Sequence, residues 1–195
     1  MKQKGLLVVC EGLDCSGKTT TIKKLMKNNN GGFIYSKGIG SDSWIGRTSS
    51  NHPSTFSLFI ELVYNTFARI RPGLRKGKIV LQDRYDISIT SFVPLTDRWY
   101  NQLFINLFKP FIEKPDAVIY FHLPLEERVK RLYEKGTPYE ISLAKNPSQI
   151  LAREREYEIW FNNFRGPKIR INTYQNDIEK TSRITKKFIE KIVSS

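Results

Sequence analysis

Short apolar runs alternate along the chain with longer segments of helical spacing. Five runs have the length, β-branched content and flanking breakers of buried strands, at residues 6–10, 33–36, 79–82, 117–123 and 168–172. Between them apolar residues recur every three or four positions, as on one face of an amphipathic helix. Strands that alternate with helices predict an α/β fold, with a five-stranded parallel sheet covered by helices on both faces.

Polar stretches rich in glycine or proline separate these elements, at residues 28–32, 38–43, 71–78 and 136–149. The last stretch is the longest and has only a weak apolar pattern, which favours a lid or surface loop over a core element. No internal repeat or linker divides the sequence. We therefore expect a single domain over residues 1–195, with a short lid at about residues 134–153.

The sequence EGLDCSGKTT, residues 11–20, directly follows the first predicted strand. Its Gly12, Gly17, Lys18 and Thr19 fill the pattern GxxxxGK[ST], in which backbone amides converge on a phosphate, lysine reaches the outer phosphates and threonine ligates Mg²⁺. A surface loop could match these letters, but the strand before the motif and the helix that begins inside it favour nucleotide binding. The predicted ATP site comprises Gly12, Leu13, Asp14, Cys15, Ser16, Gly17, Lys18 and Thr19.

A second polar signal, Asp83 and Arg84, follows the third predicted strand. An aspartate at the carboxyl edge of a parallel strand lies where open α/β sheets bind ligands, so Asp83 can hold Mg²⁺ together with Thr19. The guanidinium of Arg84 suits a second phosphate. Alone, such a pair is more typical of a turn with a surface ion pair, and the phosphate loop upstream is what favours catalysis.

Three segments resemble the thymidylate kinase family of P-loop nucleoside monophosphate kinases: the phosphate loop, RPGLRKGKIVLQDRYDIS at 71–88, and KPDAVIYFHLPLEERVKRL at 114–132. The resemblance implies the three-layer P-loop NTPase fold, with ATP and Mg²⁺ as phosphoryl donor. It also implies dTMP as the acceptor, dTDP as the product, and a homodimer.

Residue by residue, the resemblance implies that Lys18, Asp83 and Arg84 are catalytic. It implies an acceptor site formed by Asp14, Tyr64, Arg69, Arg84 and Ser88. Lys37 and Arg47 are added to this site as candidate phosphate contacts, with ordinary surface charges as the alternative. In this site Arg69 would bond the base, and Tyr64 or Phe59 would stack on it. The alternative is that the two aromatic residues belong to a helix core face and that Arg69 is solvated.

The chain departs from the family pattern at three places. Lys37 and Gly38 stand where an Arg-Glu-Pro run is frequent, and Ser91, Phe92 and Val93 replace Ala-Tyr-Gln, which leaves the acceptor base open. Cys15 stands where some members carry a phosphate-loop arginine, so the transition-state cation should come from the lid. We take Arg153 as the first candidate, and the others are Arg155, Lys145 and Arg128.

The composition adds a basic surface and a reducing environment. The 32 Lys and Arg residues against 19 Asp and Glu residues give a net charge of +13, which indicates an acidic partner. Two cysteines, Cys10 and Cys15, are too few for a disulfide framework, and no apolar run is long enough for a signal sequence or a membrane span. We therefore expect a cytoplasmic enzyme. Two alternatives stay open: a kinase of the same fold for another nucleotide or deoxynucleoside, and a non-catalytic P-loop protein that binds nucleotide or nucleic acid.

Overall fold

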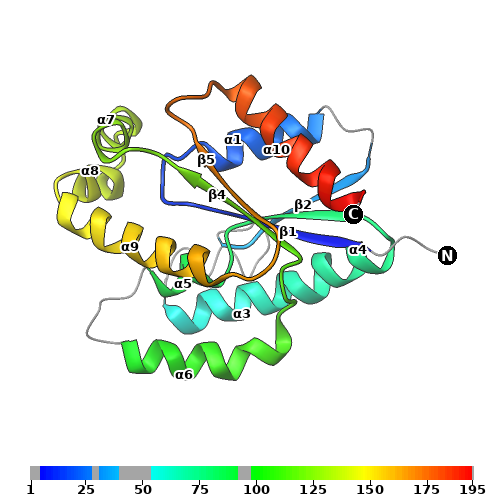
Figure 1. Cartoon of the computed structure of the whole chain (residues 1–195). Coiled ribbons are helices and arrows are strands. Elements are labelled where there is room, and N and C mark those ends of the chain that lie inside the picture. The colour runs from blue at the N-terminus through cyan, green and yellow to red at the C-terminus, as the bar shows by residue number, and fades with distance from the viewer. Residues whose placement is uncertain (1–4, 28–30, 40–53, 92–97, 195) are drawn as a thin grey trace.

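The computed structural model describes residues 5–27, 31–39, 54–91 and 98–194 (Figure 1). Its strands are β1 (Leu6–Glu11), β2 (Phe33–Lys37), β3 (Ile79–Asp83), β4 (Ala117–His122) and β5 (Lys168–Asn172). They form one sheet in the order β2-β3-β1-β4-β5, and every pairing is parallel. The five predicted strands and the parallel sheet are therefore confirmed.

Helices cover both faces of this sheet. They are α1 (Lys18–Lys27), α3 (Thr55–Asn65), the π-helical turn η1 (Thr66–Ile70), α4 (Arg71–Arg75), α5 (Asp86–Thr90), α6 (Arg98–Phe108), the 3₁₀ turn η3 (Lys109–Phe111), α7 (Leu125–Lys135), α8 (Pro138–Ala144), α9 (Pro147–Asn163) and α10 (Ile178–Val193). Helices α1 and α10 lie on one face, and α3, α4, α5 and α9 lie on the other (Figure 1). The result is the three-layer arrangement that the sequence predicts.

The two core clusters follow from the alternation of side chains along the buried strands. Val8 and Cys10 of β1 pack with Ile22 and Leu25 of α1, on the α1 and α10 face. Leu7 and Val9 point the opposite way, into the cluster of the α3 and α9 face. Because β1 is buried on both faces, its sequence is a continuous apolar run rather than an alternating one.

Two stretches that the sequence indicates as breaks are partly helical. Residues 71–75 form α4, which continues the helical run of α3 and η1 without a break, with Pro72 in its first turn, just after the π-helical turn. Residues 138–144 form α8, whose first turn is capped by the side chain of Thr137. The stretch at 136–149 is therefore not a surface loop, and its Leu143 and Ala144 are buried in the core.

Helix α3 is apolar on two sides, and the spacing of its residues does not show which of the two faces the core. Phe59 is fully buried and stacks on Phe108 of α6 with ring centroids 5.4 Å apart. Ile60, and Phe67 in the following turn η1, lie at helical spacing on the other side and are exposed. Phe56 is half exposed and packs against Phe104 and Phe108 of α6. Only the first of these sides belongs to the core.

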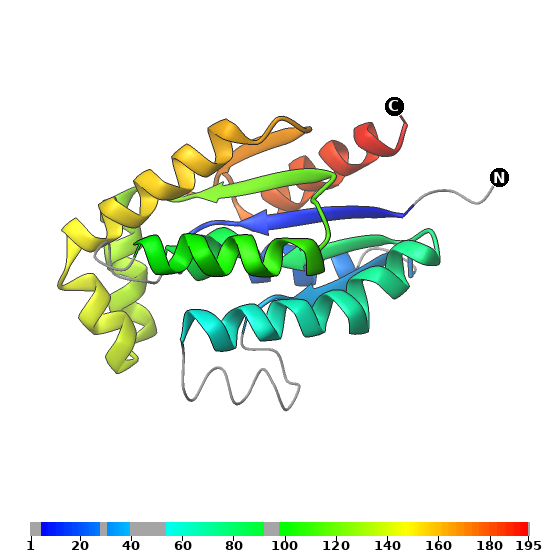
Figure 2. The same cartoon turned by 90° about the horizontal axis from the view of Figure 1, so that it is seen from below.

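The connections place the phosphate loop at the carboxyl edge of the sheet. The chain crosses from β1 to β2 on one side and from β3 to β4 on the other, so a crevice opens beyond the carboxyl ends of β1 and β3. Helix α8 and the start of α9 lie beyond the same ends (Figure 2). Residues from distant parts of the chain therefore meet at this edge.

Candidate active site

The phosphate loop joins β1 to α1 and depends on glycine at two positions. Gly12 has φ +146°, and a Cβ there would stand 2.3 Å from the carbonyl oxygen of Phe121. Gly17 has φ +77°, in the left-handed region, immediately before α1 begins at Lys18. The loop therefore turns tightly and directs the positive end of α1 toward the carboxyl edge of the sheet.

Lys18 is buried against the loop that it terminates. Its Nζ donates to the carbonyl of Leu13 at 3.0 Å, to Ser16 Oγ at 3.3 Å and also to the carbonyl of Gly12. Burial, followed by the nearby charge of Arg84, lowers the pKa of Lys18 to about 8. These bonds hold the ammonium inside the loop, where it can contact a phosphate bound by the loop amides.

Asp83 and Thr19 meet across the carboxyl ends of β3 and β1. Thr19 Oγ1 donates to Asp83 Oδ2 at 2.6 Å, and the hydroxyl of Tyr35 donates to the same oxygen at 3.2 Å. The other carboxylate oxygen, Asp83 Oδ1, is buried and has no hydrogen-bond partner within the part of the chain that the structure describes. An aspartate oxygen beside a hydroxyl is the donor set that Mg²⁺ takes when it also binds substrate phosphates, so these residues fit the ion.

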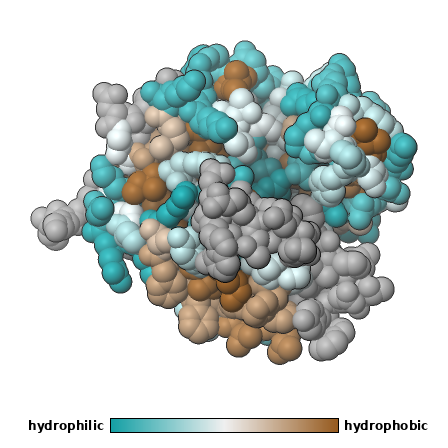
Figure 3. All heavy atoms as spheres, turned by 180° about the vertical axis from the view of Figure 1, so that it is seen from behind, coloured by the Kyte–Doolittle hydropathy of each residue, from teal (hydrophilic) through white to brown (hydrophobic). Residues whose placement is uncertain are grey.

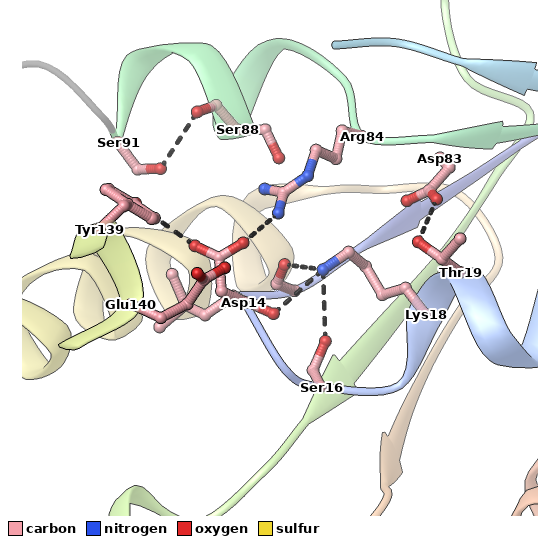
Figure 4. A network of polar contacts seen from close by, with 12 residues as sticks. Asp14, Ser16, Lys18, Thr19, Asp83, Arg84, Ser88, Ser91, Tyr139 and Glu140 are labelled. Carbon is pink, nitrogen blue, oxygen red and sulfur yellow. Dashed lines mark hydrogen bonds and ion pairs between the residues drawn. The ribbon is translucent and has the colours of Figure 1, made fainter. Parts of the chain in front are cut away.

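Arg84 reaches across the phosphate loop to Asp14, with which it forms an ion pair (Figure 4). Burial by itself would raise the pKa of Asp14, but the guanidinium of Arg84 holds it below the ordinary value. Burial acts against the charged form of Arg84 as well, and the carboxylate of Asp14 is the first of several groups that raise its pKa. Both side chains are therefore charged, and they lie side by side where two phosphorylated substrates would meet.

Glu11, the last residue of β1, organises the segment after β3. Its Oε1 accepts from the amide of Tyr85 at 2.5 Å, and its Oε2 accepts from Ser88 Oγ at 2.7 Å. Complete burial raises its pKa to about 7. Sequence reasoning missed this role, because the residue is visible in the motif while its partners lie more than 70 positions away.

The lid region approaches the site through Tyr139 of α8. The Tyr139 hydroxyl donates to Asp14 Oδ2 at 3.5 Å (Figure 4). Arg153 of α9 donates to that hydroxyl at 3.2 Å. Of the four predicted lid cations, Arg153 is thus the one that these bonds connect to the phosphate loop. Arg155 and Lys145 are exposed.

Arg128 does not act as a mobile lid cation, because it is one of the most buried side chains of the protein, with 1% exposed. One guanidinium nitrogen donates to the carbonyl of Asp14 at 2.8 Å, and the other donates to the carbonyl of Leu123 at 2.9 Å. Its role is to tie the phosphate loop to the segment between β4 and α7. The sequence does not distinguish this role from that of an exposed arginine.

The other predicted acceptor residues are dispersed. Lys37 ends β2 in register with Asp83, which places it at the same edge of the sheet. Ser88 is fully buried, and its hydroxyl is bonded to Glu11 and lies 2.8 Å from the Tyr157 hydroxyl, so the structure gives it a positioning role instead. Arg47 lies outside the described residues.

Tyr64 and Arg69 are both exposed, and their roles in an acceptor site stay predictions. Tyr64 is 41% exposed, on the same side of the helix as Ile60 and Phe67, and Arg69 is exposed on η1. The inner side of this helix instead presents two buried polar residues, Glu61 and Asn65, and the Asn65 amide donates to the carbonyl of Lys37 at 2.9 Å. Helical spacing alone did not indicate which polar residues would face the sheet.

Cys15 adopts φ +61° in the middle of the phosphate loop. Burial raises the pKa of its thiol above the ordinary value, an effect that the nearby Lys135 only partly offsets. These conditions favour an unreactive loop thiol over a reactive thiolate at this position.

Two clefts adjoin the phosphate loop. One, of about 240 Å³, extends from the loop residues to Arg84 and Lys135. The other, of about 220 Å³, lies beside Gly17 and is bounded by Arg131, Asn176 and Asp177. A larger hollow of about 790 Å³ lies at the opposite edge, around Gly5 and Asp116, and is remote from the phosphate loop. The residue chemistry, rather than the volume, identifies the first two as the functional region.

Known proteins resemble this chain over most of its length. The family model described as "Thymidylate kinase" matches residues 46–183. A probable thymidylate kinase of Thermococcus gammatolerans is 27% identical, over 92% of this chain and 93% of the relative. Another of Pyrococcus abyssi is 31% identical, over 68% and 72%.

Solved structures of thymidylate kinases share the fold. The Candida albicans enzyme aligns with a TM-score of 0.67 at 19% identity, over 96% of this chain and 92% of that one. The Ehrlichia chaffeensis enzyme gives the same TM-score at 16% identity, over 95% and 98%. The P-loop NTPase fold implied by the sequence is confirmed. A family match over more than half of the chain, on a fold that brings the phosphate loop to Asp83 and Arg84, shows that the chain belongs to the thymidylate kinase family of ATP-dependent kinases.

Proposed function

We propose that this chain transfers the γ-phosphoryl group of ATP to dTMP and forms dTDP. The observation that carries the proposal is the meeting of Lys18, Thr19, Asp83 and Arg84 at one edge of the sheet, in a chain of the thymidylate kinase family. In phosphoryl transfer the protein mainly positions two phosphates and stabilises charge, which is what this set of residues is suited to do.

The donor site is built from the phosphate loop and the cleft beside Gly17. The loop amides and Lys18 hold the β- and γ-phosphates. The nucleoside of ATP extends into the cleft bounded by Arg131, Asn176 and Asp177, which is continuous with Gly17 and Thr20. ATP then lies across the N-terminus of α1, where the helix dipole favours its charge.

Thr19 and Asp83 would hold Mg²⁺. The ion, when bound, neutralises part of the phosphate charge that develops during transfer. Support comes from the buried, unpartnered Asp83 Oδ1 and from the bond between Thr19 and Asp83, which places the hydroxyl and the carboxylate within reach of one ion. Within the described residues no cluster of three or more His, Cys, Asp or Glu side chains offers a metal site without substrate.

The acceptor phosphate is placed against Arg84, with Lys37 and Asp14 beside it. Arg84 lies in the same cleft as Lys18, so it can contact both the transferred group and its acceptor. Arg153 and Tyr139 bring the lid, residues 134–153, over the phosphate loop, and lid closure excludes water that would otherwise hydrolyse ATP. In this proposal residues 1–195 act as one catalytic domain.

We propose that two copies of the chain associate through α3 and α6. The exposed apolar residues of this face are Phe56, Ile60, Tyr64, Phe67, Leu103, Leu107 and Phe111. They produce the brown area at the bottom of Figure 3. A patch of this kind on two neighbouring helices is typical of a protein interface, and a second copy supplies the same apolar face.

A cytoplasmic location is part of the proposal and is supported by two free cysteines, Cys10 and Cys15. Among the helices that the structure describes, none has the length and apolar character of a membrane span. The basic residues outside the site leave nucleic acid as an unfavoured second partner.

A coupled ATPase assay with Mg²⁺ across nucleoside and deoxynucleoside monophosphates tests the proposal. We expect the highest kcat/KM with dTMP. Lys18→Ala should lower kcat by about 10²- to 10³-fold, since a cation that stabilises the transition state is lost. Lys23→Ala, which removes an exposed charge from the same helix, is the matched control.

Three outcomes would contradict parts of the proposal. A clear preference for another acceptor would overturn dTMP as the substrate. Full activity of the Lys18→Ala variant would remove the phosphate loop from catalysis. No turnover on any monophosphate, together with salt-sensitive binding of DNA or RNA, would favour the non-catalytic alternative.

A further inference from the structure

The backbone of Arg84 adopts a conformation that residues with a Cβ seldom take. Its φ is +71°, in the left-handed region, directly after the last residue of β3. Its amide donates to the carbonyl of Cys10 at 3.1 Å, so the residue is still attached to β1. Such conformations persist only where neighbouring groups hold them, and they concentrate at functional sites.

Gln82 supplies one of these groups. Its side-chain amide Nε2 donates to the carbonyl of Arg84 at 2.9 Å, two residues along the chain. The Gln82 side chain is fully buried, and its Oε1 has no hydrogen-bond partner among the described residues. A buried side-chain amide whose oxygen accepts no hydrogen bond is unfavourable compared with an aliphatic side chain. Packing alone therefore does not explain a glutamine at this position.

Gly38 provides the space that this contact needs. A Cβ at position 38 would stand 2.0 Å from the carbonyl oxygen of Arg84 and 2.4 Å from Gln82 Nε2. The amide of Gly38 donates to the carbonyl of Asp83 at 2.8 Å, which keeps this backbone close. The end of β2 therefore confines the Gln82 amide and the Arg84 carbonyl to one another.

The same segment carries two residues of the proposed reaction. Asp83 lies beside Thr19, and the Arg84 guanidinium lies beside Asp14 in the cleft of the phosphate loop. A change in the backbone dihedrals of Arg84 would move its guanidinium away from Asp14, while Lys18 and the loop amides stayed in place. The backbone of Arg84 thus determines where the acceptor phosphate is held relative to the donor.

We propose that Gln82 is a positioning residue for phosphoryl transfer, because its amide bond to the Arg84 carbonyl keeps Arg84 in the left-handed conformation that directs its guanidinium into the cleft. This inference rests on the proposed function, in which Arg84 binds the acceptor phosphate. It adds the residue that sets the position of Arg84.

Gln82→Met tests the inference, since methionine has a similar length and no branch but lacks the donor. We expect kcat/KM for dTMP to fall about 10- to 100-fold, as displacement of a positioning group allows, while KM for ATP stays within about twofold. Ser36→Ala is the matched control. Ser36 lies opposite Gln82 in the β2–β3 register, is equally buried, and also has an unpartnered polar atom among the described residues.

A double-mutant cycle with Arg84→Ala separates positioning from stability. In the Arg84→Ala background, Gln82→Met should change kcat/KM by less than about twofold, because Gln82 acts only by positioning the guanidinium that is already absent. If Gln82→Met lowers activity equally in both backgrounds, or if kcat/KM stays at the wild-type value in the single variant, the inference is wrong. If the Gln82→Met variant does not fold, Gln82→Leu replaces it in the same double-mutant cycle.

The two proposals fail in different ways. If the wild-type enzyme prefers another monophosphate, the assignment of dTMP fails, and the same cycle with that acceptor still tests Gln82. If the wild-type enzyme phosphorylates dTMP and the variants show no coupling between positions 82 and 84, only the positioning role of Gln82 is wrong.

Discussion

Replacing Glu11 by glutamine should make the stability of the protein less dependent on pH. Glu11 is fully buried, and burial raises its pKa from an ordinary value of 4.5 to about 7. Its protonated form is therefore favoured in the folded state. The contribution of Glu11 to stability is greatest below pH 4.5, falls as the pH rises through this interval, and stays at its lowest value above about pH 7.

The magnitude follows from the size of this pKa change. A difference of 2.5 units, 7 minus 4.5, corresponds to about 3 kcal/mol at alkaline pH. Between pH 5 and pH 8 the free energy of unfolding of Glu11→Gln should rise relative to wild type by about 2 to 3 kcal/mol. For a chain of this size, that corresponds to a relative gain in Tm of about 5 to 10 °C.

Chemical denaturation at half-unit pH intervals measures this difference. Glutamine can still accept from the Tyr85 amide and donate to Ser88, so the fold should persist. Glu179→Gln removes an exposed carboxylate and should leave the pH dependence unchanged. A constant offset between Glu11→Gln and wild type from pH 5 to pH 8 would show that Glu11 ionises at its ordinary pKa, and the reasoning from burial would be wrong.

Three further changes test the roles assigned above. Arg128→Met leaves the carbonyl of Asp14 without its donor. We expect the free energy of unfolding, measured by urea denaturation, to fall by about 2 to 4 kcal/mol, and the KM for ATP, measured from initial rates, to rise. An unchanged stability would contradict the role of Arg128 in holding the phosphate loop. Phe67→Asp should convert a dimer to a monomer in light scattering, whereas Ile159→Asp, at an exposed position of α9, should not. Equal masses for both variants would exclude the proposed face. Tyr139→Phe removes the hydroxyl between lid and loop, so ATP hydrolysis without acceptor should increase relative to transfer, and an unchanged ratio would show that this contact does not control closure.

The sequence by itself determined the strands and the chemistry of the phosphate loop. Buried parallel strands are short apolar runs, and the bounds of all five in the structure lie within one residue of those predicted. The pattern around Gly12, Gly17 and Lys18 is equally local, because a tight turn, a close backbone approach and a helix start all depend on neighbouring residues. Such features are encoded in a few consecutive positions.

The tertiary structure decided which residues of each helix face the site. Tyr64 of α3 and Arg69 of η1 have the types expected for an acceptor site and are both exposed, while Asn65 of α3 is turned toward β2. Periodicity shows that a helix has an apolar side, and it does not show which of two apolar sides meets the sheet. The same limit applies to Arg128, whose burial depends on the packing of α7 against the phosphate loop.

The polar network behind the site could not be predicted for a related reason. Glu11 bonds to Tyr85 and Ser88, and Gln82 bonds to a carbonyl that Gly38 leaves accessible. The two Glu11 contacts join segments that are more than 70 positions apart in the chain. The Gln82 contact is local, but it depends on Gly38, which only the pairing of β2 with β3 brings beside it. The side chains proposed for catalysis could thus be named from the sequence, whereas the residues that hold them in place follow from the order in which the strands pack.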